Sequence, residues 1–431
     1  MVRNVASLAD LFDYRARRFA ERCTTCGECL EVCPIFPLTK FASSGPRVAM
    51  EKLTDLLSGG EVSDEAYELV FSCNGACGIC ANACPEGLVL YAAFIPAMAK
   101  IAASGRDFPP KIYQHTHGHR YHFPDFFSAL QLKPSQERWL RRAPVDPQPV
   151  NVVFFGGCGA TGIPSLLLEA TAILDRMGLN FAALSAQELC CGAGPMLYGD
   201  PQAAEDIGRR LVANIATFRP KKAIFFCTSC QVMFKWTLSR FMEVPFETCE
   251  LSEFLSENID SIPFQKRVDK VVTVHDSCTM ASTGSFESVR NLLRAIPGVS
   301  LVEMPHNRQN NLCCGGFATS MRPEVVTAER RAPLDEAHST GAEVMALTCT
   351  GCQKSFAPFV HQYPFEIRNY ISLVAEGLGV NQENRFMEYM ASGDVDQVLA
   401  EARDCIGASQ YSLDEVRNTL ADYLETYRIR D

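Results

Sequence analysis

The sequence lacks the hydrophobic segments that would take the chain into or across a membrane. Its start, MVRNVASLADLFDYRARRFAERC, carries charges throughout and has no apolar core of the kind found in signal peptides. The longest apolar stretch, LVLYAAFIPAMA at 88–99, contains a proline and is too short to span a bilayer. We therefore expect a cytoplasmic protein, whose thiols are kept reduced.

Positive charge is also scarce. The chain has 40 Lys and Arg against 50 Asp and Glu, which gives a net charge of −10. A protein with this balance is not expected to have nucleic acid or anionic lipid as its main partner. The sequence contains no flavin or nicotinamide motif. Its 431 residues, 47% of them hydrophobic, suit two or three ordinary globular domains.

Cysteine, in contrast, is abundant, with twenty residues in the chain. Such a count is typical either of a secreted protein rich in disulfides or of a cytoplasmic protein loaded with metal. The missing signal peptide favours the second class. We therefore interpret the cysteine clusters as metal sites.

Two cysteine quartets lie near the N-terminus. The first, in CTTCGECLEVCP, has the C-x2-C-x2-C-x3-C-P spacing of bacterial ferredoxins and consists of Cys23, Cys26, Cys29 and Cys33. The second, in CNGACGICANACPEG, has one extra residue in its first gap and consists of Cys73, Cys77, Cys80 and Cys84. We expect two cubane [4Fe–4S] clusters with crossed ligation, one held by Cys23, Cys26, Cys29 and Cys84 and the other by Cys73, Cys77, Cys80 and Cys33. Two four-cysteine zinc sites are the alternative, although zinc sites use paired cysteines rather than quartets that end in proline.

The segment between the quartets is predicted to be helical. SGPRVAMEKLTDLLSGG and SDEAYELVFSC both have helical patterns, and Ser63 is expected to cap the second. We assign residues 1–105 to a mostly α-helical ferredoxin domain and residues 106–149 to a linker. The linker contains four histidines: His115, His117, His119 and His122. They could bind a transition metal, but no cysteine or acidic partner adjoins them, so packing or a partner surface is the simpler interpretation.

After residue 150 the chain repeats a pattern of five cysteines. The first copy is C-x31-CC-x35-C-x2-C and consists of Cys158, Cys190, Cys191, Cys227 and Cys230. The second copy is C-x34-CC-x34-C-x2-C and consists of Cys278, Cys313, Cys314, Cys349 and Cys352. Each cysteine of the first copy recurs 120 to 123 residues later, which indicates a structural repeat.

Each copy is predicted to be an α/β unit. Short apolar runs precede the cysteines in NVVFFGGC, KKAIFFCTSC, KVVTVHDSC and EVMALTCTGC, and such runs are typical of buried parallel strands. Helical patterns follow in PSLLLEATAILDRMG and FESVRNLLRAIPG, so strand and helix alternate around a parallel sheet. The cysteines are expected to meet at the carboxyl ends of the strands, where such folds bind ligands. Gly192 and Gly315, which follow the CC pairs, leave room for close backbone approach.

The number of cysteines per copy discriminates between metal groups. Zinc and a cubane cluster each take four protein ligands, and a thioredoxin-like C-x-x-C would use two cysteines and leave the CC pair idle. Structural disulfides are not expected in a reducing compartment. A larger, non-cubic iron–sulfur group, in which one thiolate bridges two irons, would use all five.

The two repeats resemble the CCG (cysteine-rich) domains of heterodisulfide reductase and its relatives, and the quartets resemble a ferredoxin subunit fused in front of them. The resemblance covers about residues 20–105 and 150–375 and implies CCG domains at 150–262 and 263–375. It implies that each quintet holds a non-cubane [4Fe–4S] cluster and that a disulfide is cleaved between the two clusters. Both repeats are complete, whereas many relatives that serve hydroxy-acid dehydrogenases keep one complete unit. This favours disulfide chemistry.

The resemblance implies an iron–sulfur oxidoreductase that moves electrons between a partner and a disulfide or dithiol, either a small molecule or a sulfur-carrier protein. The partner would be a flavoprotein, a membrane cytochrome b or a quinone-interacting subunit. A membrane partner would hold the chain on the inner face of the cytoplasmic membrane, as in transmembrane redox complexes of sulfate reducers. The alternative is a pure electron relay, as in iron–sulfur subunits of quinone-linked glycolate, lactate and glycerol-3-phosphate dehydrogenases.

Three further features complete the interpretation. His275, beside Cys278 in VHDSC, could donate a proton during catalysis, or could simply be packed at a strand end. Residues 376–431 are predicted to form a C-terminal extension of two or three amphipathic helices, with Ser412 capping the last, and this extension could serve in docking. Cys249 and Cys405 lie outside every motif and are expected to be ordinary thiols.

Overall fold

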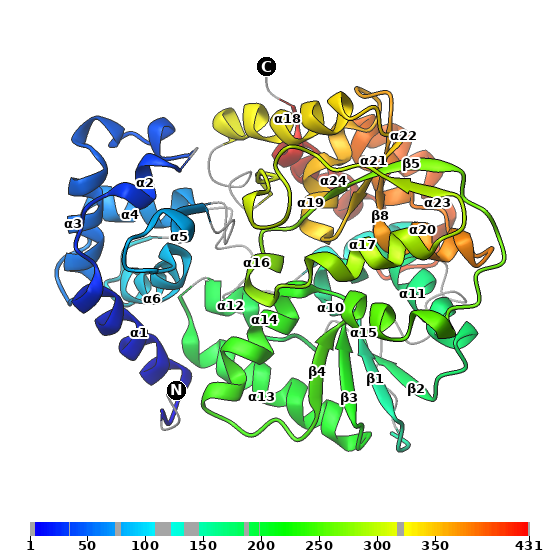
Figure 1. The fold of residues 1–431 in the computed structure, drawn as a ribbon, viewed down its shortest axis with the longest axis horizontal. Coiled ribbons are helices and arrows are strands. Elements are labelled where there is room, and N and C mark those ends of the chain that lie inside the picture. Colours follow the sequence, from blue (N-terminus) through cyan, green and yellow to red (C-terminus); the bar gives the residue numbers. More distant parts are fainter. Residues whose placement is uncertain are drawn as a thin grey trace.

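The computed structural model describes residues 5–33, 35–73, 79–107, 122–132, 146–184, 189–197, 199–316 and 323–429. A helical N-terminal part, coloured blue in Figure 1, lies beside two α/β units, and a group of C-terminal helices lies against the second unit. This architecture confirms the predicted fold class.

The N-terminal part consists of helices packed around a core of their own. They are α1 (Leu8–Arg22), α2 (Glu28–Glu31), α3 (Pro46–Leu57), α4 (Asp64–Ser72), α5 (Ile79–Ala83) and α6 (Leu90–Ala103). Apolar residues at helical spacing, such as Leu53 and Phe94, are buried together between them. Ser63 caps α4 by accepting a hydrogen bond from the backbone N–H of Ala66 at 3.1 Å, as predicted. Among the helices of the described residues, none has the length and apolarity needed to cross a bilayer.

Each α/β unit contains a four-stranded parallel sheet, with the strand order β2-β1-β3-β4 in the first unit and β6-β5-β7-β8 in the second. The strands are β1 (Val152–Phe155), β2 (Phe181–Leu184), β3 (Lys222–Phe225), β4 (Glu247–Glu250), β5 (Lys270–His275), β6 (Val299–Leu301), β7 (Val344–Leu347) and β8 (Glu366–Asn369). The four predicted strands are the two central strands of each sheet, which are largely buried because helices cover both faces. The four edge strands, which are more exposed than the central ones, were not predicted: β4, β6 and β8 contain polar residues, and the apolar β2 is short and only partly buried.

Helices connect the strands and cover the sheets. In the first unit they are α10 (Gly157–Thr161), α11 (Pro164–Arg176), α12 (Ala193–Leu197), α13 (Pro201–Thr217), α14 (Thr228–Trp236) and α15 (Leu251–Glu257). In the second they are α16 (Met280–Thr283), α17 (Phe286–Ala295), α18 (Pro323–Ser339), α19 (Thr350–Phe356) and α20 (Tyr370–Gly377). The helices predicted after the first strands, α11 and α17, are present. The two units pack on each other through α11 against α20 and α15 against α17.

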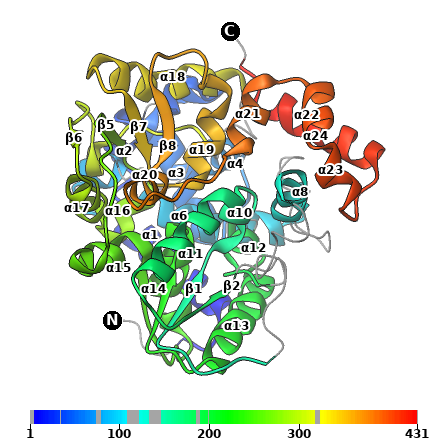
Figure 2. The same cartoon turned by 90° about the vertical axis from the view of Figure 1, so that its right-hand side faces the viewer.

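Four C-terminal helices pack on the second unit, drawn in orange and red in Figure 2. They are α21 (Arg385–Ser392), α22 (Val395–Glu401), α23 (Arg403–Gly407) and α24 (Leu413–Tyr427), which is more than the two or three predicted. Ser412 caps α24, as predicted, in a capping box with Glu415. The fully buried guanidinium of Arg330, on α18, donates a hydrogen bond to the carbonyl of Tyr427 at 3.1 Å and so fixes the end of α24.

The segment predicted as a linker contains a helix that belongs to the core. Helix α8 (His122–Gln131) contacts α10 of the first unit and α21 and α23 of the C-terminal group. Phe126 packs edge-on against Tyr411, and Phe127 packs edge-on against Phe386, with ring centroids 5.7 and 5.1 Å apart. The side chains of the four linker histidines lie outside the described residues: His115, His117, His119 and His122.

Candidate iron–sulfur sites

The cysteines of each repeat gather at the carboxyl ends of the central strands. Cys158 follows β1 and lies in α10, and Cys227 follows β3 as the N-cap residue of α14. In the second unit Cys278 follows β5, and Cys349 is the N-cap residue of α19 after β7. In both sheets the two strands concerned are neighbours at the point where the strand order reverses. This is where parallel α/β sheets bind ligands.

The five thiols of the first unit are close enough to form hydrogen bonds with one another. Hydrogen bonds from Cys190 and Cys230 lower the pKa of Cys191 to about 6. A hydrogen bond from Cys230 likewise lowers the pKa of Cys227 to about 6. A hydrogen bond to Cys190, together with burial, raises the pKa of Cys158 well above its usual value. The structure therefore brings together all five cysteines of this quintet.

The second unit assembles its thiols in the same way. Hydrogen bonds from Cys313 and Cys352, followed by an interaction with His275, hold the pKa of Cys314 well below its usual value. Hydrogen bonds to Cys314 and Cys349 raise the pKa of Cys352. The sulfur atoms of Cys314 and Cys352 and a ring nitrogen of His275 all lie within 4.8 Å of one another. The CC pair and the C-x-x-C pair therefore meet in one site.

His275 is a strand-end residue whose ring also faces this site. It is the last residue of β5, is 1% exposed and packs edge-on against Phe356 with ring centroids 5.0 Å apart. In the second sheet, His275 at the end of β5 pairs with Leu347 of β7. In the first sheet, Phe155 at the end of β1 pairs with Phe225 of β3, so Phe155 occupies the position of His275. The equivalent residue in the first unit is thus a phenylalanine, so packing at this position does not require an imidazole.

Glycines make room for the thiols. A Cβ atom on Gly157, whose φ is +73°, would lie 3.0 Å from Cβ of Cys227 and 3.2 Å from Sγ of Cys230. Gly192 has φ +87°, and a Cβ there would lie 2.3 Å from the carbonyl oxygen of Ala204. The close backbone approach predicted at Gly192 is therefore present.

Backbone N–H groups point at three of the thiols, in each case from the glycine two residues further along the chain. The N-to-Sγ distances are 3.5 Å for Gly192 to Cys190, 3.4 Å for Gly315 to Cys313 and 3.3 Å for Gly351 to Cys349. Donors aimed at sulfur favour the thiolate over the thiol. The two CC pairs thus share one local geometry.

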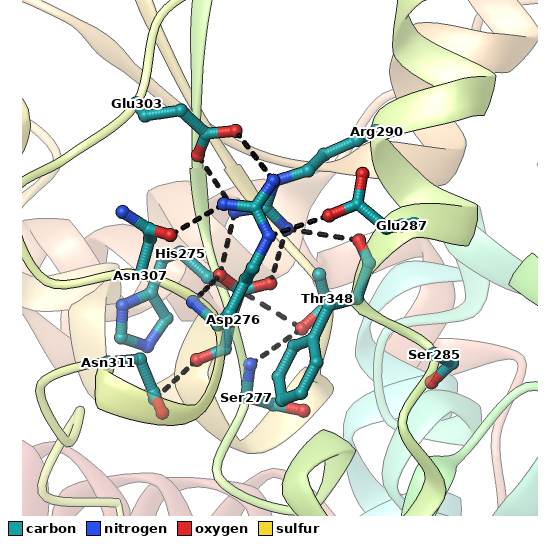
Figure 3. A network of polar contacts seen from close by, with 12 residues as sticks. His275, Asp276, Ser277, Ser285, Glu287, Arg290, Glu303, Asn307, Asn311 and Thr348 are labelled. Carbon is teal, nitrogen blue, oxygen red and sulfur yellow. Dashed lines mark hydrogen bonds and ion pairs between the residues drawn. The ribbon is translucent and has the colours of Figure 1, made fainter.

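A buried arginine positions the cysteine-bearing loops of the second unit (Figure 3). Arg290, on α17, donates to both carboxylate oxygens of Asp276 at 2.8 and 2.9 Å and to both oxygens of Glu303 at 2.8 and 2.9 Å. The side chains of Arg290 and Asp276 are 0% exposed. Asn311 donates to the carbonyl of Asp276 at 2.7 Å. Asp276 and Asn311 each precede a cysteine of the quintet by two residues, so this network ties two cysteine-bearing loops together.

Lys354, a half-buried residue of α19, lies close to thiols of both quintets. Burial lowers the pKa of Lys354 to about 8, although thiolate charges from both units oppose this decrease. The thiols that act on Lys354 are Cys158, Cys349 and Cys227. Helices α10 and α19 also contact each other, and a Cβ on Gly159 would lie 2.8 Å from Oγ1 of Thr350. A cation of the second unit therefore lies close to thiols of both.

The N-terminal quartets are also partly assembled. One pocket is lined by the four cysteines predicted to share a cluster, Cys23, Cys26, Cys29 and Cys84. In the other predicted quartet the charge of Cys33 acts on Cys80, and Cys73 is the C-cap residue of α4. Cys77 lies outside the described residues. The charge of Glu329, on α18, acts on Cys33, so this quartet lies close to the second α/β unit.

These residues fit iron–sulfur groups. Thiolate is the form of cysteine that binds iron, and Cys191 and Cys227 carry the lowered pKa values that favour it. Burial alone has the opposite effect, because it raises the pKa of Cys249, outside the motifs, to about 12. Cys405 is likewise buried and remote from the motifs in sequence, as expected of an ordinary thiol. Cys191 and Cys227 therefore differ from an isolated buried thiol, because hydrogen bonds from neighbouring thiols outweigh the effect of burial on their pKa values.

Three buried or half-buried charged residues of the two α/β units were not predicted from the sequence: Arg290, Lys354 and Glu250. Lys354 could have been identified from the sequence, since it follows Cys352, the last cysteine of CTGC, by two residues. Arg290 and Glu250 had no such local signal, because their partners come from other elements of the fold.

Comparison with known proteins agrees with this organisation. Residues 152–235 and 272–357 match the family described as cysteine-rich domain, CCG, and residues 19–88 match the 4Fe-4S dicluster domain. The chain is 26% identical to a subunit of dihydromethanophenazine:CoB–CoM heterodisulfide reductase from Methanosarcina barkeri, over 84% of this chain and 94% of the relative. It is 24% identical to a subunit of fumarate reductase (CoM/CoB) from Methanothermobacter marburgensis, over 79% and 68%. It is 26% identical to the glycolate oxidase iron–sulfur subunit of Escherichia coli, over 83% and 93%.

Proposed function

Since this chain joins a 4Fe–4S dicluster domain to two cysteine-rich CCG domains and is homologous to a heterodisulfide reductase subunit, we propose that it acts on a disulfide. The proposed reaction is reduction of a disulfide to two thiols, or the reverse, in the space between the CCG domains. The broader assignment, an iron–sulfur oxidoreductase subunit, follows from the homology itself.

The observation that carries the proposal is the arrangement of both quintets around Lys354. Thiolate charges of Cys158 and Cys227 from one unit and Cys349 from the other act on this cation. A disulfide has two sulfur atoms and yields two anions when it receives two electrons. Two cysteine sites with a cation close to thiols of both suit such a substrate, because one sulfur could approach each site while Lys354 offsets the developing negative charge.

The residues assigned to each group follow the predicted sets. The non-cubane [4Fe–4S] clusters would be held by Cys158, Cys190, Cys191, Cys227 and Cys230, and by Cys278, Cys313, Cys314, Cys349 and Cys352. The cubane clusters would be held by Cys23, Cys26, Cys29 and Cys84, and by Cys73, Cys77, Cys80 and Cys33. When bound, such groups supply electrons singly. His275, whose ring faces Cys314, is proposed to hold a proton for the product thiol.

Partner subunits complete the proposal. The relatives are subunits of redox enzymes, and the sequence of this chain has no flavin or nicotinamide motif. We propose that a membrane cytochrome b or quinone-interacting subunit exchanges electrons with the N-terminal domain and holds the chain at the cytoplasmic face of the membrane. The substrate would be a small disulfide, of which the CoB–CoM heterodisulfide named in the relative is one example, or a sulfur-carrier protein with paired cysteines.

The experiment that tests this function is electron paramagnetic resonance of the anaerobically purified, oxidised protein. Four [4Fe–4S] groups correspond to roughly 16 irons per chain, so iron and sulfide are measured first. Coenzyme M and 2-mercaptoethanol are then added separately. We expect a new paramagnetic signal that depends on thiol and is lost in Cys191→Ser or Cys314→Ser. Cys249→Ser is the matched control, because this buried thiol lies outside both quintets.

A second candidate function is a pure electron relay, favoured by the 26% identity to the glycolate oxidase iron–sulfur subunit. A relay predicts that neither thiol changes the spectrum while a flavoprotein dehydrogenase reduces every cluster. That result would replace the disulfide proposal with the relay. A protein with zinc and no sulfide would exclude both functions.

A further inference from the structure

Glu250 is a buried carboxyl group at the boundary between the two α/β units and outside both quintets. It ends β4, precedes α15 and is 3% exposed. Ser285, the N-cap residue of α17 in the second unit, donates a hydrogen bond to Oε2 of Glu250 at 2.6 Å. Oε1 of Glu250 has no hydrogen-bond partner in the described part of the chain. Burying a carboxylate oxygen without a hydrogen-bond partner costs free energy, so the environment favours the protonated carboxyl group.

Glu250 lines a small cavity whose walls come from both α/β units. The volume open to the centre of a water-sized sphere is about 10 Å³, close to what one water molecule needs. Thr228 and Thr348 line the same cavity, and they directly adjoin Cys227 and Cys349 in the chain. The cavity thus places a carboxyl group beside chain neighbours of one cysteine from each quintet.

A short chain of hydroxyl groups links Glu250 to the surface. Oγ of Ser285, which donates to Glu250, lies 2.9 Å from Oγ1 of Thr283. Thr283 is partly exposed and is followed by the exposed Gly284. Hydroxyl groups both donate and accept hydrogen bonds, so this chain can pass a proton between solvent and the carboxyl group.

Helix capping does not explain why this residue carries a carboxyl group. Glu250 caps α15 in a capping box with Glu253. In the sheet register Phe225 pairs with Glu250, as Leu347 pairs with Asn369 in the second unit. The neutral Asn369 occupies the equivalent position and caps α20. A cap at this position therefore works without a titratable group.

The groups around Glu250 bring its pKa close to neutral pH. Burial raises the pKa of Glu250 to about 7, and the negative charge of Glu253 on α15 adds to this increase. Hydrogen bonds from hydroxyl groups of the second unit oppose it in part. From α20, Tyr370 faces Glu250, and burial raises its pKa as well. On β4, burial raises the pKa of Cys249 to about 12. Helices α16 and α17 present hydroxyl groups to Glu250, and α14 lines the cavity with Thr228.

We propose that Glu250 takes up a proton from solvent, through Thr283 and Ser285, when an electron reaches the paired CCG sites, and releases it when the electron leaves. One electron from an external one-electron reductant adds one negative charge, and conversion of the carboxylate to the carboxylic acid removes one. Reduction of a disulfide consumes two electrons and two protons, and proton uptake by Glu250 would compensate the charge of one of the two electrons. This inference rests on the proposed function.

The experiment measures how the midpoint potentials of the CCG sites depend on pH. Potentials of the holoprotein are determined by redox titration followed by paramagnetic resonance between about pH 6 and 9. In the wild type we expect the equilibrium constant for reduction to fall as much as tenfold per pH unit above about pH 7, which is 59 mV for one electron. Glu250→Asn, which copies the neutral cap of the second unit, should make the potential independent of pH. Glu250→Asp should restore the dependence.

Glu169→Gln is the matched control. Glu169 is 1% exposed, accepts a hydrogen bond from Ser372 at 2.6 Å and has a pKa that burial raises to about 7, so its chemistry resembles that of Glu250. It lines a different pocket, whose walls contain no cysteine among the described residues. We expect Glu169→Gln to retain the wild-type pH dependence. If Glu250→Asn does not fold, Glu250→Gln replaces it, because this variant keeps the side-chain length.

An infrared difference spectrum between the oxidised and reduced protein gives a second readout. Wild type should gain a protonated carboxyl band on reduction, and Glu250→Asn should lack it. Retention of the pH dependence in Glu250→Asn, its loss in Glu169→Gln, or failure of Glu250→Asp to restore it would overturn the role of Glu250. Redox signals whose potentials do not vary with pH in wild type would overturn it too, while leaving the proposed function intact. Absence of any redox signal would instead contradict the proposed function.

Discussion

Cys191 and Cys249 are both buried thiols of the first α/β unit, but their neighbours differ. Hydrogen bonds from other thiols lower the pKa of Cys191 to about 6, whereas burial raises that of Cys249 to about 12. Within the first quintet, hydrogen bonds between thiols therefore favour the thiolate form of Cys191 and Cys227, while they raise the pKa of Cys158. At the scale of the residue, the site depends on short-range contacts that a single atom can disrupt.

Gly157 provides the sharpest test at this scale. In Gly157→Ala the new Cβ would lie 3.0 Å from Cβ of Cys227, so the first quintet should lose its iron–sulfur group. We expect roughly a quarter of the iron and sulfide to be missing, since one of four groups would be lost. Gly178→Ala is the control, because Gly178 has φ +70° but nothing within 4 Å of the Cβ position. It should cost about 1 kcal/mol of stability and no iron. Equal iron loss in both variants would contradict the steric explanation.

Helix α17 supports the second quintet from outside. It presents Arg290 to the end of β5 and to the strand-loop segment that carries Glu303. The buried charges are fully paired, so the arrangement fixes the positions of the loops more than it adds stability. At the scale of the element, a helix that carries no cysteine therefore helps to fix the positions of the cysteine-bearing loops.

Arg290→Met should leave the carboxylate of Asp276 buried without its cationic partner. Loss of one partner of a buried ion pair costs about 3–5 kcal/mol, and we expect the second CCG unit to bind less iron. Denaturant unfolding and iron content measure the two effects. Arg294→Met is the control on the same helix, because Arg294 is 51% exposed and its ion pair with Glu287 spans 3.8 Å. An unchanged unfolding midpoint in Arg290→Met would show that the network is dispensable.

The whole molecule is held together by contacts between units that lie far apart in sequence. Ser372 of the second unit donates to Glu169 of the first, and the backbone N–H of Leu8 in α1 donates to Glu205 in α13 at 2.8 Å. Helix α8 links the first unit to the C-terminal helices. These contacts bring the quintets together and place the quartet of Cys33 close to the second unit. The proposed electron route therefore depends on how the units pack.

The contact between Glu169 and Ser372 predicts that stability depends on pH. Burial raises the pKa of Glu169 from 4.5 to about 7 in the folded protein. The folded state therefore binds the proton more tightly than the unfolded state, and stability is lost as pH rises through about 7. Glu169→Gln should be about 2–3 kcal/mol more stable than wild type at about pH 8 and similar at about pH 5.

Denaturant unfolding midpoints at the two pH values measure this difference. Glu383→Gln serves as the control, since Glu383 lines the same pocket but is 72% exposed. It should leave the pH dependence unchanged. A wild-type midpoint that does not fall between the two pH values would contradict the assignment to Glu169.

The sequence by itself determined the features that depend on neighbours along the chain. Cysteine spacing identified the quartets and quintets, continuous apolar runs identified the central strands, and Ser63 and Ser412 identified two helix starts. Each of these features is local, because a cap, a strand run or a C-x-x-C pair involves residues a few positions apart. The repeat could be predicted as well, since it copies one local pattern twice.

Tertiary structure alone decided what lies between the units. The short edge strands and α8 were not predicted from the sequence, because contacts with their partners in the fold stabilise them. The same holds for Lys354, Arg290 and Glu250, whose environment is made by side chains from distant elements. Burial and electrostatic effects depend on distances in space, and chain spacing does not specify those distances until the units are packed.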